Sequence, residues 1–367
     1  MRVLSVFGTR PEAVKMSPVV RELIATEGIE SRVCVTAQHR QMLDQVLTLF
    51  DIHPDYDLDL MQENQALAEI SANIFTHLDA VYADFQPDWV LVQGDTTTVA
   101  IASLAAYYRR IHVGHVEAGL RTHNKWAPFP EEINRRVAGV VADLHFAPTD
   151  WSRENLLKEG VPDRIIHVTG NPVIDALHFV AEQPEPEEIK TLLAELGIGK
   201  QELVLVTAHR RENFGGPIEN ISRALKELAG RGDVEIIYPV HLNPNVQEPV
   251  NRILGDVPHV TLVPPVDYLA QVHLMRHAKI ILTDSGGIQE EAPAFGVPVL
   301  VMRDVTERPE GITAGTLKLV GTKADIILRE AVRLLDDPSA HAQMAKAVNP
   351  FGDGKSAKRI VTALRSH

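Results

Sequence analysis

Short apolar runs rich in β-branched residues alternate with segments of helical periodicity along the whole chain, and the alternation stops once and begins again. The strand-like runs are residues 1–7, 33–36, 89–92, 112–116, 143–146 and 165–168 in the first half, and 203–206, 235–238, 260–263, 280–282, 298–301 and 317–320 in the second. Helical patterns lie between most of them, for instance over residues 66–85. Strands that alternate with helices form a parallel sheet covered on both faces, so the predicted fold class is α/β.

The interruption lies between about residues 170 and 188, where Gly170-Asn171-Pro172 and a segment rich in Pro and Glu break the periodicity. A chain of 367 residues is also too long for one ordinary core. We therefore predict two similar α/β domains, residues 1–170 and 171–352. Ligands of open α/β sheets bind beyond the carboxyl ends of the strands, so the residues that end each strand are the site candidates.

The acidic composition restricts the partners of the chain. A net charge of −13 argues against nucleic acid or an anionic membrane, since either would need a basic face, and an anionic ligand would have to be held by local cations. The first apolar run is too short for a signal-peptide core and no run approaches transmembrane length, so we expect a cytoplasmic protein. The single cysteine, Cys34, lies in an apolar run and is expected to be a buried thiol.

The stretch Thr283-Asp284-Ser285-Gly286-Gly287 stands between an apolar run and a helical pattern. This order predicts a strand, a tight turn and a helix start. Such a turn can bind a phosphate, because the first N–H groups of a helix carry partial positive charge and glycines let an anion approach the backbone. Glu290 and Glu291 lie about one turn further on, where a carboxylate can reach the hydroxyls of a ribose. The alternative is an ordinary glycine turn.

Three acidic residues of the first half stand at strand ends or helix entrances. Asp95 follows the run 89–92 and could instead cap the next helix, which is the simpler interpretation when this residue is taken alone. Glu117 ends the run 112–116, and Glu131 opens a helical pattern, where the alternative is a charged helix end. Arg10 and Lys15 frame the first helix start, where a cation can face a diphosphate or remain solvated.

The second half places cations at its strand ends. His209 and Arg210 follow the run 203–206, and a histidine followed by two arginines indicates an anion or acid–base site; Arg308 lies in a further cationic loop. The sequence contains no strand-linked dinucleotide motif, no Walker loop and no metal cluster, so no cofactor and no metal are expected. The residues alone predict an enzyme for a nucleoside-diphosphate ligand, most simply a sugar, bound in a cleft between the halves. They leave the reaction open.

Seven motifs occur in order along the chain: Phe7-Gly8-Thr9-Arg10-Pro11-Glu12, Gln93-Gly94-Asp95-Thr96-Thr97, Gly114-His115-Val116-Glu117-Ala118-Gly119-Leu120-Arg121, Pro130-Glu131-Glu132-Ile133-Asn134-Arg135, His209-Arg210-Arg211-Glu212-Asn213, Pro239-Val240-His241-Leu242-Asn243-Pro244-Asn245 and Thr283-Asp284-Ser285-Gly286-Gly287-Ile288-Gln289-Glu290-Glu291. Together they resemble the non-hydrolysing UDP-N-acetylglucosamine (UDP-GlcNAc) 2-epimerases of bacteria. The resemblance covers essentially the whole chain. It implies two Rossmann-like domains of the glycosyltransferase-B type, a UDP-binding second domain, a last helix (353–367) joined to the first domain, and a homodimer.

The resemblance also implies a reaction. UDP leaves to give 2-acetamidoglucal and adds back after protonation of the opposite face, so that UDP-GlcNAc becomes UDP-N-acetylmannosamine (UDP-ManNAc), a precursor for cell-surface polysaccharide. Catalytic roles are implied for Asp95, Glu117, Glu131 and His209, and UDP contacts for Arg10, Lys15, Arg135, Ser285, Gly286, Gly287, Glu291 and Arg308. Gln38, Gln41, Arg210 and His241 match a site at which some members bind a second, activating substrate molecule. Which acid takes which proton stays open.

Three rival functions share parts of this pattern. A hydrolysing 2-epimerase would release UDP and N-acetylmannosamine, and a retaining glycosyltransferase of the same fold would need an acceptor groove that the sequence does not reveal. A non-catalytic sensor of nucleotide sugars is disfavoured, because binding alone would not require three acids at strand ends.

Overall fold

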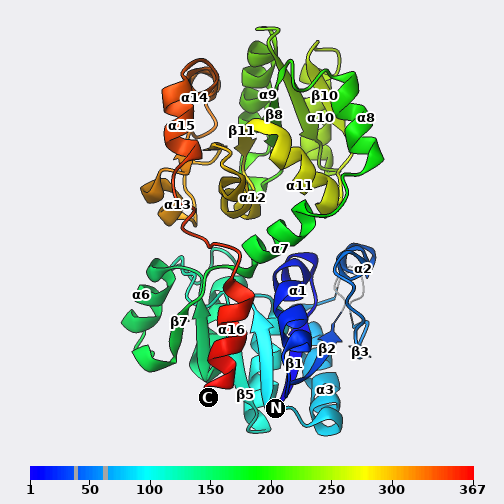
Figure 1. Ribbon diagram of the computed structural model, residues 1–367, viewed down its shortest axis with the longest axis vertical. Helices are drawn as coiled ribbons and strands as arrows, with labels where there is room; N and C mark the ends of the chain where they lie inside the picture. The colour runs from blue at the N-terminus through cyan, green and yellow to red at the C-terminus, as the bar shows by residue number, and fades with distance from the viewer. Residues whose placement is uncertain (37–39, 61–64) are drawn as a thin grey trace. The chain divides into compact units, whose positions relative to one another are not determined.

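The computed structural model describes residues 1–36, 40–60 and 65–367. The chain divides into two compact units, each with its own sheet (Figure 1). Unit 1 comprises Met1–Ala176 together with Phe351–His367, and unit 2 comprises Leu177–Pro350. Within the described ranges, no helix has both the length and the apolar character needed to cross a membrane.

The elements of unit 1 alternate as the sequence predicts. They are β1 (Arg2–Phe7), α1 (Arg10–Ala25), β2 (Glu30–Val35), α2 (Arg40–Leu49), β3 (Tyr56–Asp57), α3 (Leu67–Phe85), β4 (Trp89–Gln93), α4 (Thr97–Tyr108), β5 (His112–Val116), α5 (Glu131–Val141), β6 (Leu144–Ala147), α6 (Asp150–Lys158), the 3-10 turn η1 (Asp163–Ile165), β7 (Ile166–Val168), the first half of α7 (Pro172–Ala181) and α16 (Ser356–Arg365).

Unit 1 is built on a parallel sheet that has seven strands in the described residues, in the order β3-β2-β1-β4-β5-β6-β7. Helices cover both faces of this sheet, so its central strands are buried; Val90, Leu91 and Val92 of β4, for instance, are fully buried. The chain leaves β1 toward one edge of the sheet and returns at β4 to build toward the other edge. The pair β1/β4 is therefore the topological switch point of unit 1.

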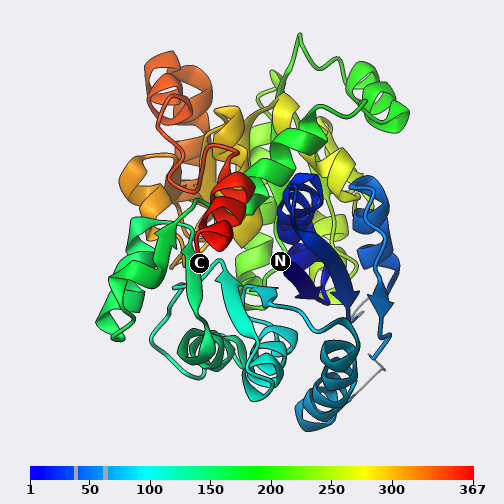
Figure 2. The same cartoon turned by 60° about the horizontal axis from the view of Figure 1, so that its bottom comes forward.

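The C-terminal helix α16 belongs to unit 1 and lies beside α1 (Figures 1 and 2). The Asp175 carboxylate of α7 accepts hydrogen bonds from the backbone N–H groups of Ser356 and Ala357 at 3.1 and 2.9 Å, which satisfies the start of α16. Ile360 and Leu364 are fully buried. The last residues of the chain thus complete the core of the first unit.

Unit 2 repeats the architecture. Its elements are the second half of α7, α8 (Glu187–Glu195), β8 (Glu202–Thr207), the 3-10 turn η2 (Arg211–Asn213), α9 (Gly216–Ala229), β9 (Val234–Pro239), α10 (Pro244–Leu254), β10 (Val260–Val263), α11 (Tyr268–His277), β11 (Ala278–Thr283), α12 (Gly286–Glu291), the 3-10 turn η3 (Ala292–Phe295), β12 (Val299–Val301), α13 (Pro309–Ala314), β13 (Leu317–Leu319), α14 (Ala324–Asp336) and α15 (Pro338–Ala345). Its parallel sheet has the strand order β10-β9-β8-β11-β12-β13, so its switch point is β8/β11.

The predicted α/β class with two Rossmann-like sheets is confirmed. Every strand-like run of the sequence became a strand, and the helix predicted over residues 66–85 is α3. The short strand β3 was not predicted, because Tyr56 and Asp57, which pair with β2, have no apolar run of their own. Cys34 is fully buried, as expected, and burial raises the pKa of its thiol.

Candidate active site

Glu117 is the most firmly held acid of unit 1. It follows β5 with a φ of 62° and is 5% exposed. Both of its carboxylate oxygens accept hydrogen bonds from Nζ of Lys15 on α1 at 2.7 Å. Asn171 Nδ2 donates to Oε1 at 3.1 Å, and Gln93 Nε2 donates to Oε2. A cation and two amides therefore fix an ionised carboxylate at the carboxyl end of the sheet.

Asp95 lies at the end of β4, the switch-point strand, and is paired with Arg135 of α5. Arg135 donates to Asp95 Oδ2 from Nε at 2.9 Å and from Nη2 at 2.6 Å. The simpler interpretation of Asp95 as a helix cap is wrong, because the N-cap of α4 is Thr96, whose hydroxyl accepts from the Val99 N–H. Asp95 turns toward α5 instead, where a buried guanidinium compensates its charge.

The two acids that open α5 have different surroundings. Glu132 is fully buried and accepts from the backbone N–H groups of Thr122 and His123 at 3.0 and 3.1 Å, so it anchors the loop that precedes α5. Glu131 is half-buried, one turn before Arg135 on the same helix face, and its Oε2 is buried without a hydrogen-bond partner in the described residues. The alternative that an acid at this helix start has only a structural role thus fits Glu132, while Glu131 remains a candidate for chemistry.

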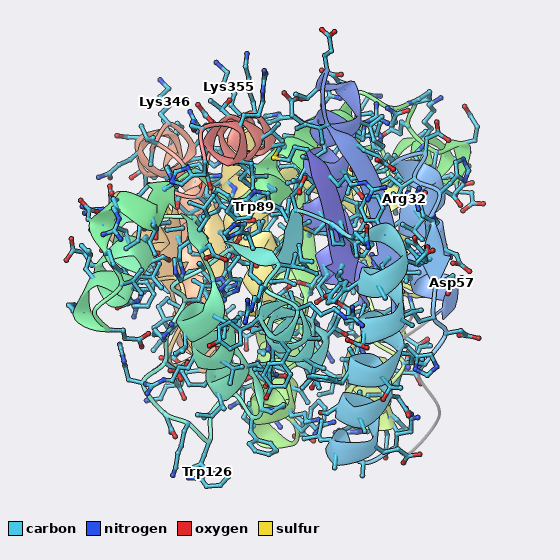
Figure 3. The ribbon with its side chains drawn as sticks, turned by 90° about the horizontal axis from the view of Figure 1, so that it is seen from below. Arg32, Asp57, Trp89, Trp126, Lys346 and Lys355 are labelled. Atoms are coloured by element: carbon cyan, nitrogen blue, oxygen red, sulfur yellow. The ribbon has the colours of Figure 1, made fainter. Side chains whose placement is uncertain are left out.

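The loop anchored by Glu132 carries exposed aromatic side chains. Trp126 is 68% exposed and stacks on Phe129 with ring centroids 5.8 Å apart. Figure 3 shows Trp126 projecting away from the sheet.

The start of α1 is closed by its own side chains. Thr9 caps the helix, and the buried Glu12 accepts from the N–H groups of Gly8 and Thr9 at 2.9 and 2.7 Å. Thr96 donates its hydroxyl to the other Glu12 oxygen at 2.7 Å, so this carboxylate joins the turns after β1 and β4. Burial raises the pKa of Glu12, and the hydrogen bonds offset this only in part. Arg10 is half-buried at the first position of the helix.

In unit 2, the buried Asp284 organises the switch point. Its Oδ2 accepts from the backbone N–H groups of His209 and Arg210 at 2.8 Å each and from Asn213 Nδ2 at 2.9 Å. Its Oδ1 lies 3.5 Å from His209 Nδ1. Burial lowers the pKa of His209, Asp284 acts in the opposite direction, and Arg210 and His241 lower it further, so the imidazole is neutral at pH 7. The ring of His241 stacks on it at 5.4 Å.

The predicted glycine turn is present at the end of β11. Ser285 is the N-cap of α12, which Gly286 and Gly287 open. A Cβ on Gly286 would lie 3.2 Å from the Arg308 guanidinium, so the glycine allows that cation to lie against the turn.

The acids of α12 have separate partners. Arg308 donates to Glu290 Oε1 at 2.8 Å, and Tyr268 donates its hydroxyl to Glu291 Oε1 at 2.8 Å. Among the described residues, no group of three or more His, Cys, Asp or Glu side chains could hold a metal ion.

Three polar residues that contact the predicted ones were not themselves predicted as site residues. Gln93 and Asn171 both donate to Glu117, and Asp284 accepts from the backbone of His209 and Arg210. In the sequence, Gln93 is part of a motif, Asn171 part of the hinge and Asp284 the end of a strand.

Of the four residues predicted for an activating substrate, Gln38 lies outside the described residues, and Gln41 falls in α2 with only its backbone described. Arg210 Nε is buried without a hydrogen-bond partner in the described part of the chain.

The two sheets, with acids and cations at their switch points, define a two-unit Rossmann-like α/β protein of the glycosyltransferase-B type. A sequence profile of the family described as UDP-N-acetylglucosamine 2-epimerase matches residues 21–365. The chain belongs to this family.

Named relatives and solved structures agree with this assignment. The UDP-N-acetylglucosamine 2-epimerase of Salmonella typhimurium is 57% identical, over 100% of this chain and 99% of that protein. The crystal structure of UDP-GlcNAc 2-epimerase from Neisseria meningitidis bound to UDP-GlcNAc has a TM-score of 0.92 at 51% identity and covers 100% of both chains. That of the Methanocaldococcus jannaschii enzyme in complex with UDP-GlcNAc and UDP has a TM-score of 0.82 at 32% identity, again over 100% of both.

Proposed function

We propose that this chain interconverts UDP-GlcNAc and UDP-ManNAc without net hydrolysis, by eliminating UDP and adding it back, and so supplies a precursor for cell-surface polysaccharide. The observation that carries the proposal is the constellation at the carboxyl ends of β4 and β5, where Asp95 and Glu117 are each held by a cation. The 51% identity to a protein solved with UDP-GlcNAc bound supports the choice of substrate.

The chemistry explains why these residue types are needed. The C2 hydrogen of the sugar has no adjacent carbonyl, so direct deprotonation is prohibitive, whereas departure of UDP from C1 creates an electron demand that a positioned base can meet. A carboxylate takes the C2 proton as the C1–O bond breaks, which leaves 2-acetamidoglucal and UDP; a proton then returns to the opposite face and UDP adds back. We propose Asp95, Glu117 and Glu131 as the acid–base groups and neutral His209 as a partner of the diphosphate or a proton donor.

The leaving group must be stabilised where its charge develops, and unit 2 offers the groups for this. We propose that Ser285, Gly286, Gly287 and Arg308 contact the diphosphate and that Glu291 binds the ribose. Arg10, Lys15 and Arg135 complete the proposed UDP contacts from unit 1. One substrate molecule would then engage both units, with UDP held mainly by unit 2 and the sugar presented to the acids of unit 1.

One experiment separates this function from its rivals. The protein is incubated with UDP-GlcNAc in deuterated water and the products are followed by NMR. We expect deuterium at C2 in both nucleotide sugars and UDP-ManNAc with its diphosphate attached. Stoichiometric free UDP with N-acetylmannosamine would instead establish hydrolysis, and free UDP that forms only with an acceptor sugar would establish transfer.

We further propose a homodimer. Tyr107 and Tyr108 end α4 with 59% and 65% exposure, and Phe75 of α3 packs edge-on against Tyr108 at 5.5 Å. Exposed aromatic rings at the end of a helix are typical of a contact surface. Sedimentation equilibrium should give about twice the 40.5 kDa chain mass, and replacement of both tyrosines by Glu should return the single-chain mass if α4 forms the contact.

A further inference from the structure

The turn Gly94-Asp95-Thr96 is held by side chains from several elements. Asn134 of α5 donates to the Asp95 carbonyl at 2.9 Å, and Thr96 donates to Glu12 of α1 at 2.7 Å. His115 of β5 supplies the remaining contact, with Nε2 at 2.7 Å from the Gly94 carbonyl oxygen. The backbone that carries Asp95 is therefore fixed on both sides of this residue.

The contact of His115 specifies the state of its ring. A carbonyl oxygen can only accept a hydrogen bond, so the proton must be on Nε2. The ring is 1% exposed; burial lowers its pKa to about 4, with Arg121 acting in the same direction and the Gly94 carbonyl, Asp95 and Glu117 acting in the opposite one. The neutral ring then has a lone pair on Nδ1, and this atom is buried without a hydrogen-bond partner in the described residues. One tautomer alone is compatible with this site.

The carbonyl that His115 contacts belongs to a residue of unusual backbone conformation. Gly94 has a φ of +81°, a conformation that side-chain-bearing residues rarely adopt, and its carbonyl belongs to the peptide that leads into Asp95. Rotation of that peptide would move the Asp95 carboxylate relative to Arg135. A hydrogen bond to the Gly94 carbonyl opposes this rotation directly.

We infer that His115 is a positioning residue for catalysis: its Nε2–H group fixes the Gly94 carbonyl and thereby orients Asp95. The inference rests on the proposed function, in which Asp95 is an acid–base group. His115 touches no reacting atom in this role, so it should affect turnover much more than the affinity for UDP.

The neighbouring strand provides a matched control. His145 of β6 is the register partner of His115 and is equally buried, with 1% exposure. It lines a cavity of about 420 Å³ beside α5 and α6. In the described residues its Nδ1 has no partner, and none of its hydrogen bonds reaches the turn Gly94-Asp95-Thr96. A variant at His145 therefore removes a buried imidazole from the same sheet without touching the Asp95 turn.

Three variants test the inference by NMR assay of UDP-ManNAc formation, with KM, UDP affinity and melting temperature measured alongside. In His115→Gln the amide nitrogen can take the place of Nε2, whereas in His115→Asn it is too short to reach the Gly94 carbonyl. We expect His115→Asn to lower kcat about 10- to 100-fold with little change in KM or UDP affinity. His115→Gln should recover most of that loss, and His145→Asn should stay within about two-fold of wild type at a comparable loss of melting temperature.

The tautomer gives a readout that does not depend on turnover. Long-range ¹⁵N NMR of the wild-type protein should find His115 neutral with its proton on Nε2. A proton on Nδ1, or equal kcat values for His115→Asn and His145→Asn, would overturn the positioning role while UDP-ManNAc is still formed. A wild-type protein that forms no UDP-ManNAc would overturn the proposed function itself, and the positioning role with it.

Discussion

The buried His115 and His145 should make unit 1 less stable in acid, and the variant His145→Asn removes the contribution of one of them. Burial lowers the pKa of His145 from 6.5 to about 3, and the ring nitrogen in the fold is neutral at pH 5. Below pH 6.5 the unfolded chain binds a proton that the folded chain does not, so stability present above pH 6.5 is lost as the pH falls toward 3. At 1.36 kcal/mol per pKa unit, His145 alone should lower the free energy of unfolding by about 2 kcal/mol between pH 7.5 and pH 5.

Tryptophan fluorescence can follow this unit alone, because Trp89, Trp126 and Trp151 all lie in unit 1. Urea unfolding is measured at pH 7.5, 6 and 5 for the wild type and for His145→Asn. Between pH 7.5 and pH 5 the free energy of unfolding should fall by about 2 kcal/mol more in the wild type than in His145→Asn, whatever the difference between the two proteins at pH 7.5. Replacement of the exposed His77 on α3 by Asn controls for the loss of a histidine as such. Parallel pH dependences of wild type and His145→Asn would refute the reasoning.

Other predictions concern the acids directly. Glu117→Gln should lower kcat at least about 100-fold, by the NMR assay, while UDP affinity by calorimetry stays similar. Lys15→Met leaves Glu117 buried without its cation and should lower the free energy of unfolding by about 3 kcal/mol in urea, so an unchanged midpoint would disprove the pairing. On α5, Glu131→Gln should lower turnover without a change in stability, whereas Glu132→Gln should lower the melting temperature. The reverse result would make Glu132 the acid–base candidate and Glu131 the loop anchor. Asp284→Ala removes the acceptor of three donors, should cost about 3 kcal/mol of stability, and should weaken UDP binding measured by calorimetry.

The fold was predictable because its signal is local. Most of the buried parallel strands are largely apolar runs that can be recognised without their partners, and the order of strands and helices along the chain restricts the sheet to few topologies. The same reasoning explains why β3 was missed, because Tyr56 and Asp57 pair with β2 through their backbone at the edge of the sheet. A two-residue pairing of polar character leaves no pattern in the sequence.

The arrangement of the candidate site could be predicted only in outline. Strand-end acids can be recognised from position, but their partners come from distant parts of the chain: Arg135 is 40 residues from Asp95, and Lys15 is 102 residues from Glu117. Asp95 illustrates the consequence, since a capping role is the simplest local interpretation of an acid before a helix and yet the neighbouring Thr96 takes it. Which acid caps, which anchors a loop and which remains for chemistry depends on tertiary contacts.

The N-termini of α1 and α12 differ in whether their backbone N–H groups are available to a phosphate. At the start of α1, backbone N–H groups that could bind a phosphate are already used by Thr9 and Glu12 in a capping box. At the start of α12, the N-cap Ser285 makes no side-chain capping bond within the described residues, and Arg308 lies against Gly286. An incoming anion would have to displace a buried carboxylate at α1 but not at α12. For this reason we expect the diphosphate to be bound by unit 2, which leaves the acids at the carboxyl ends of β4 and β5 to move the protons.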